Sequence, residues 1–100
     1  MKIKTIDVNA KEWFDRINGN SYFSGTVTVN FGMKDEKEFI MPAQYGYGDQ
    51  YLYEARARLI EHNMLSMPYG SSLSKYCREN DLILRANKQE GCLKREVWNV

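Results

Sequence analysis

Residues 24–31, Ser-Gly-Thr-Val-Thr-Val-Asn-Phe, alternate apolar and polar side chains in the pattern of a strand. The two valines and Phe31 would face one side of this strand, and the threonines the other. A charged turn follows at 32–37, and residues 38–41 predict the returning strand. Pro42 lacks a backbone donor, so this strand ends there or lies at the edge of a sheet. The two segments therefore predict a hairpin with one face in water.

The N-terminal part predicts a strand followed by a helix. Residues 2–8 alternate as a short strand would. Residues 9–17 carry the signals of a helix start, because Asn9 can cap the first turn and Glu12 stands where a capping box requires it. Gly19 can supply the left-handed stop. The apolar stripe of this helix would consist of Trp13, Phe14 and Ile17.

Two more helices are predicted after the hairpin. Asp49 can cap a helix over 50–62. Its apolar stripe would consist of Leu52, Ala55, Leu59 and Ile60. A connector at 63–70 precedes a short third helix that ends at Asn80 and begins at Ser71 or Ser72. The inward side chains of that helix would be Leu73, Tyr76 and Cys77.

The end of the chain predicts a second hairpin, with strands at 82–87 and 92–98 and Gly91 in the turn. The elements together predict one α+β domain over residues 1–100. We expect an antiparallel sheet of two hairpins plus an N-terminal strand, with two to three short helices packed on one face.

Composition and charge are those of an ordinary globular protein. Hydrophobic residues make up 43% and charged residues 27% of the chain, which argues against disorder. Fourteen basic and 13 acidic residues give a net charge of +1, so no global attraction to nucleic acid or membrane is expected. The sequence shows neither a secretory signal nor an apolar run of about 18 residues. We therefore expect a cytoplasmic protein without a membrane partner.

Groups for catalysis are few. Cys77 and Cys92 are expected to be buried free thiols, the alternative being a disulfide. With His62 they supply too few ligands for a zinc site. Cys77 could serve as a nucleophile with His62 as its base, but the positions favour a core residue and a helix-end side chain. Neither an enzymatic activity nor a cofactor or metal is predicted.

A Gly/Tyr loop at 44–48 runs into the helix that begins at residue 50. Such a loop can present backbone N–H groups to a phosphate. Neither a dinucleotide fingerprint nor a P-loop is met, however, and Asp49 would compete with an anion for those donors. The favoured interpretation is a tight turn.

Tyrosine is the most informative residue type. Seven of the 100 residues are tyrosine, and Tyr45, Tyr47, Tyr51 and Tyr53 fall within nine positions. On a helix, Tyr51 and Tyr53 lie about 200° apart, so at least one of them should face water. Exposed tyrosine is typical of binding interfaces. The alternative is that the rings cover the core. Together with Arg56, these four tyrosines are the predicted partner-binding residues.

Basic side chains give a second signal. They lie on the helix over 50–62 and in the last third of the chain: Arg56, Arg58, Lys75, Arg78, Arg85, Lys88, Lys94 and Arg95. Acidic residues are interspersed with them, so solvated faces of mixed charge are the simpler interpretation. Combined with tyrosine rings, such a surface could bind single-stranded nucleic acid.

Residues 13–23, Trp-Phe-Asp-Arg-Ile-Asn-Gly-Asn-Ser-Tyr-Phe, and residues 44–49, Gln-Tyr-Gly-Tyr-Gly-Asp, resemble segments of small uncharacterised proteins of bacteriophages and prophages. The resemblance implies a phage accessory protein, a class that includes anti-CRISPR and other anti-defence inhibitors. It assigns no functional residue. Many such inhibitors are strongly acidic, whereas this chain is near neutral, which argues against a mimic of DNA.

The predicted function is that of a small non-enzymatic binding protein. It would occlude a host protein or complex through the tyrosine-rich surface. The alternatives left open are a nucleic-acid-binding accessory protein, a homo-oligomer that uses the same surface, and a small enzyme.

Overall fold

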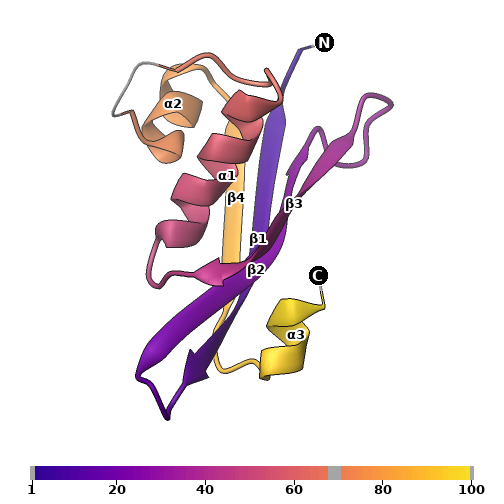
Figure 1. Cartoon of the computed structure of the whole chain (residues 1–100). Coiled ribbons are helices and arrows are strands. Elements are labelled where there is room, and N and C mark those ends of the chain that lie inside the picture. The colour runs from indigo at the N-terminus through magenta and orange to yellow at the C-terminus, as the bar shows by residue number, and fades with distance from the viewer. Residues whose placement is uncertain (1, 68–70, 100) are drawn as a thin grey trace.

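The computed structural model describes residues 2–67 and 71–99, so the last three residues of the predicted connector, 68–70, lie outside the described residues. Four strands form one sheet in the order β3-β2-β1-β4 (Figure 1). The strands are β1 (Thr5–Asp15), β2 (Asn20–Val29), β3 (Lys37–Tyr45) and β4 (Ile83–Gln89). The helices are α1 (Gln50–Glu61), α2 (Leu73–Glu79) and α3 (Lys94–Trp98).

The sheet is mixed, so the prediction of an α+β fold is confirmed and that of a purely antiparallel sheet is wrong. β2 pairs antiparallel with both β1 and β3, as a hairpin requires. β1 and β4 are parallel. The connection explains this, because α1 and α2 carry the chain from the β3 edge across the sheet to the other edge, and parallel neighbours need such a crossover. Pro42 lies within β3, at an edge of the sheet, beside an irregularity in the register with β2.

The predicted helix over 9–17 is wrong, because β1 runs through it to Asp15. The backbone pairs with β2 along this whole stretch and with β4 as far as Lys11. These ladders replace the hydrogen bonds of a helix that would be too short to be stable alone. Part of the predicted stripe, Phe14 and Ile17, is exposed instead. Gly19, with φ +70°, serves the turn between the two strands.

The predicted second hairpin is wrong as well. β4 pairs with β1, which is distant in the sequence. Residues 94–98 form the helix α3 where a strand was predicted. Gly91 does turn the chain, with φ +71°. The turn brings the Cys92 N–H to the carbonyl oxygen of Glu12 on β1, at 3.0 Å, so the chain returns toward β1 without forming a strand.

The core lies on one face of the sheet. Alternate residues of the central strands point to it and are fully buried: Ile6, Val8, Val27 and Val29. α1 and α2 cover this face with Tyr51, Ala55, Leu59, Leu73 and Cys77. Each large apolar side chain buried there contributes about 1.5–3 kcal/mol, so this layer supplies most of the stability. Of the predicted α1 stripe, Ala55 and Leu59 are confirmed, while Leu52 and Ile60 are only partly buried.

α3 packs on the opposite face, so the prediction of helices packed on one face holds for α1 and α2 and fails for α3. Ser24 points away from the core face, and its hydroxyl donates to the carbonyl oxygen of Val97 at 2.5 Å. Val97 itself is fully buried. Figure 1 shows α1 and α2 together across the sheet and α3 apart from them.

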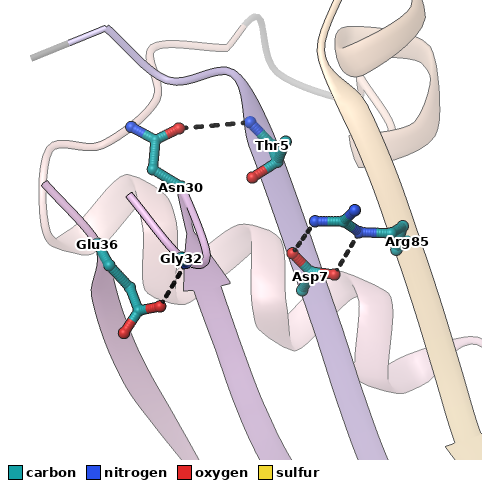
Figure 2. A network of polar contacts seen from close by, with 6 residues as sticks. All are labelled: Thr5, Asp7, Asn30, Gly32, Glu36 and Arg85. Carbon is teal, nitrogen blue, oxygen red and sulfur yellow. Dashed lines mark hydrogen bonds and ion pairs between the residues drawn. The ribbon is translucent and has the colours of Figure 1, made fainter. Parts of the chain in front are cut away.

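Polar contacts close the end of the sheet where the chain begins. Asn30, buried and with φ +52°, accepts hydrogen bonds from the backbone N–H groups of Lys4 (2.7 Å) and Thr5 (3.4 Å). Figure 2 shows the second of these bonds and, beside it, the two-pronged ion pair between Arg85 on β4 and Asp7 on β1, at 2.6 and 2.9 Å. The pair joins the two parallel strands, and its exposed position limits its worth to about 1 kcal/mol or less.

Candidate binding surface

Three of the four clustered tyrosines stand in solvent. The exposed fractions are 58% for Tyr45, 68% for Tyr47 and 60% for Tyr53. All three line one hollow of about 390 Å³. The rest of its wall is made by Gly46, Gly48, Asp49 and Gln50. We call these three side chains and the hollow between them the tyrosine surface.

The loop that carries Tyr45 and Tyr47 is held against the sheet. The Gly46 N–H donates to the carbonyl oxygen of Ser21 at 3.0 Å. A Cβ at Gly46 would lie 2.6 Å from the Phe23 ring and 2.7 Å from Cγ of Gln50, so only glycine lets the loop pack this closely. Tyr45, the last residue of β3, places its ring edge-on to Tyr22 at 6.0 Å between centroids. The tyrosine surface is therefore built on fixed backbone.

Tyr51 does not belong to this surface, so its prediction as an exposed partner-binding residue is wrong. Only 8% of it is exposed, and it packs in the core. The reason is helical geometry, because Tyr51, Ala55 and Leu59 succeed one another at intervals of four residues and share a face. Burial raises the pKa of the Tyr51 phenol, and the nearby charge of Asp49 raises it further. Tyr53 points the other way, into water.

Arg56, the predicted anchor residue, lies further along α1. It is partly buried and is not among the residues that line the hollow. The structure thus brings Tyr45, Tyr47 and Tyr53 together and leaves Tyr51 and Arg56 outside the group.

Charges around the tyrosine surface are predominantly negative. Asp49 is exposed at the start of α1, and its side chain makes no capping hydrogen bond. Behind the loop, the Lys88 ammonium donates to the carbonyl oxygen of Gly48 at 2.9 Å. Two carboxylates balance that ammonium, Glu12 at 3.1 Å and Glu90 at 3.5 Å. Desolvation lowers the pKa of Lys88, but the bonds and charges of these carboxylates outweigh it and leave the pKa raised.

The interpretation of the glycine loop as a tight turn is supported. Three backbone N–H groups in and just after the loop donate within the protein. That of Gly46 donates to the carbonyl oxygen of Ser21 at 3.0 Å, that of Gln50 to the carbonyl oxygen of Tyr47 at 3.1 Å, and that of Leu52 to the carbonyl oxygen of Asp49 at 2.9 Å. Gly48 has φ +60°, the left-handed conformation that glycine adopts readily. With Asp49 standing at the helix end, the loop has the wrong charge for a phosphate.

The thiols and the histidine occupy structural positions. Cys77 and Cys92 are free and buried, as predicted. Burial raises the pKa of both thiols, whereas an activated cysteine needs a lowered one. His62 stands at the C-terminal end of α1, and its ring stacks on Phe39 at 4.4 Å between centroids. Within residues 2–67 and 71–99, no group of three or more His, Cys, Asp or Glu side chains could hold a metal ion.

Sequence reasoning missed a second aromatic group, formed by Trp13, Tyr22 and Trp98, which we call the α3 cluster. Trp13 and Tyr22 are paired in the β1–β2 register and stack at 5.7 Å. Trp98 meets both rings edge-on, at 5.8 and 5.2 Å. The Lys94 ammonium lies 5.5 Å from the Trp13 ring and 5.7 Å from that of Trp98. A hairpin with its turn at residues 16–19 would have predicted the first of these pairs.

Comparisons of the chain with protein-family models, with curated proteins and with solved structures give no match. Among the helices that the structure describes, none is long and apolar enough to cross a membrane.

Proposed function

We propose that this chain is a non-catalytic binding protein that contacts a protein partner through the tyrosine surface. The observation that carries the proposal is that Tyr45, Tyr47 and Tyr53 are each more than half exposed and line a common hollow. Exposed large rings gathered in one concave place mark sites of interaction.

The rigidity of this surface supports the same function. Tyrosine offers a large contact area with few rotatable bonds, so little side-chain entropy is lost on binding. The packing of Gly46 against Phe23 fixes the loop in advance, which lowers the cost of ordering it in a complex. A preformed surface of this kind suits a binding protein that acts by covering a site on its partner.

The resemblance to phage and prophage accessory proteins indicates the kind of partner. It favours a protein or complex of the bacterial host, bound in the host cytoplasm and blocked by steric occlusion. An inhibitor of a defence system would act in this way without chemistry of its own.

A specific observation keeps nucleic acid as the second candidate. Lys94 lies over two rings of the α3 cluster. The elements that carry these rings hold three more basic side chains: Lys11 on β1, Arg16 directly after it, and Arg95 on α3. No ion pair of these four is found within the described residues. Binding there would weaken steeply with salt, because phosphate contacts release counterions. Undetectable or salt-insensitive binding to single- and double-stranded DNA and RNA would remove this candidate.

Capture of a partner from bacterial lysate tests the first candidate. The wild-type chain should retain a stoichiometric partner that the double variant Tyr45→Ala, Tyr47→Ala loses. The matched control is Phe31→Ala, which removes an equally exposed ring at the turn before β3 and should retain the partner. Equal capture by the double variant contradicts the proposal. Light scattering of the free chain separates a second copy of itself from a different partner.

A further inference from the structure

We infer that the tyrosine surface recognises a cation, and that the partner presents an arginine or lysine side chain to it. This inference rests on the proposed function and names the chemistry of the partner. It is drawn from three features: the exposed tyrosines that line the hollow, the carboxylate of Asp49, and the charges of the Lys88 group behind the loop.

The rings are arranged to receive a group between them. No ring contact joins Tyr45, Tyr47 and Tyr53 to one another, although all three line the hollow. Of the three, Tyr45 alone touches another ring of the described residues, and it meets Tyr22 edge-on. The negative faces of separated tyrosine rings attract a cation placed among them, and arginine does this most often in proteins.

Asp49 supplies the charge in the same hollow. Its carboxylate makes no capping hydrogen bond, and no ion pair of it is found in the described parts of the chain. The partial positive charge at the start of α1 is about half a unit, so the full negative charge of Asp49 exceeds it. Among the residues that line the hollow, Asp49 carries the sole formal charge.

The lysine behind the loop does not oppose this. Lys88 reaches the back of the loop at Gly48 but is balanced by Glu12 and Glu90. Lys88 with these two carboxylates has a net charge of −1, and Asp49 adds another. The charges of Asp49 and of the Lys88 group therefore favour a positive group in the hollow over a phosphate or a carboxylate.

The test uses a pair of small probes on the full chain. Nα-acetyl-arginine amide is titrated and followed by the backbone amide signals in NMR, and Nα-acetyl-citrulline amide is its neutral counterpart of nearly identical shape. The arginine probe should saturate in the millimolar range and shift the signals of Tyr47, Asp49 and Tyr53. The citrulline probe should bind at least about threefold more weakly, because it lacks the charge. The lysine amide should bind in the same place.

Variants separate the contribution of the Asp49 charge from that of the Tyr53 ring. Asp49→Asn should weaken arginine binding about threefold, while Asp35→Asn, which removes an exposed carboxylate at the turn before β3, should leave it unchanged. Tyr53→Leu should weaken it about two- to fivefold, and Tyr53→Phe should restore it, because the ring and not the hydroxyl attracts the cation.

Equal binding of citrulline and arginine overturns the inference, as does an arginine shift that misses the tyrosine surface. If arginine does not bind but the double variant Tyr45→Ala, Tyr47→Ala still loses the partner, this inference fails and the proposed function stands. If arginine binds but the double variant keeps its partner, the proposed function fails and the inferred partner chemistry fails with it.

Discussion

The α3 cluster and the tyrosine surface are both made of aromatic residues, but their rings are arranged differently. In the α3 cluster, Trp13, Tyr22 and Trp98 cover one another, and their contacts attach α3 to the outer face of the sheet. In the tyrosine surface the rings stand apart around a hollow. Ring contacts within a protein contribute about 0.5–1.5 kcal/mol per pair beyond burial, so the first group stabilises the fold and the second leaves that attraction available to a partner.

Tyr45 connects the two groups, because its ring touches Tyr22 and the residue also lines the hollow. The comparison teaches that a count of aromatic residues cannot identify a binding surface. The α3 cluster and the tyrosine surface differ in whether their rings contact one another. The variants that follow should change stability in one group and binding in the other.

The largest effect is expected at the α3 cluster. Trp98→Ala should lower the free energy of unfolding by about 2 kcal/mol, roughly half the cost of a fully buried tryptophan, because Trp98 is partly exposed. Urea denaturation measures the change. Partner capture at saturating concentration should persist, since Trp98 does not line the tyrosine surface. A stability change below about 0.5 kcal/mol would show that the cluster does not hold α3.

The next largest effect is expected where the tyrosine loop meets the core. Gly46→Ala should cost about 1–2 kcal/mol, because its Cβ would clash with Phe23 and Gln50. It should also weaken partner binding by displacing the loop. Gly48→Ala is the matched control, since it meets open space and costs only about 1 kcal/mol of backbone strain at φ +60°. NMR should show the Phe23 ring signals shifted in Gly46→Ala alone.

A smaller stability effect is expected within the tyrosine surface. Tyr47→Ala should change the free energy of unfolding by no more than about 0.5 kcal/mol, because the ring is largely exposed. Its affinity for the partner should nevertheless fall at least about tenfold, as truncation of a central interface aromatic does. A destabilisation as large as that of Trp98→Ala would erase the distinction between the two groups.

The smallest effect concerns Asp15, at the turn beside the α3 cluster. The side-chain hydrogen bond from Asn18, at 2.8 Å, is the main cause that holds the pKa of Asp15 below its ordinary value. A lowered pKa adds stability above the unfolded-state value, and this stability is lost as pH falls through the folded-state value. Asn18→Ala should raise the pKa of Asp15 toward 3.8, as NMR titration of its carboxyl would show. An unchanged pKa would mean that the backbone donors of the turn suffice.

Local signals predicted the elements that depend on local interactions. The hairpin of β2 and β3 follows from alternation, and α1 from its apolar stripe. α2 follows from its stripe and its cap, because the Ser72 hydroxyl accepts the Lys75 N–H at 3.1 Å, whereas the Asp49 side chain makes no such bond at α1. Local signals failed where pairing with a strand distant in the sequence competes with helix formation. Asn9 and Glu12 imitate a capping box, yet both lie within β1, between β2 and β4. β4 pairs across more than 70 residues of sequence, which no short pattern encodes.

The tyrosine surface was predictable in part, because local patterns show which residues cluster but not how the elements pack. Clustering in the sequence singled out Tyr45 and Tyr47, and both line one hollow. Helical geometry indicated that Tyr51 and Tyr53 point to different sides of α1. It did not indicate which of them is buried, because that depends on how α1 packs on the sheet. The role that we infer for Asp49 was not predicted, because a residue directly before a helix is normally interpreted as its cap.

Nitration of tyrosine by tetranitromethane, read by mass spectrometry, tests the assignment of the tyrosine surface most directly when it is done with and without the captured partner. In the free chain Tyr45, Tyr47 and Tyr53 should be modified, and Tyr51 should be protected. In the complex all three should become protected. Modification of these three rings to the same extent in the complex as in the free chain would contradict the assignment of the tyrosine surface as the place where this protein binds.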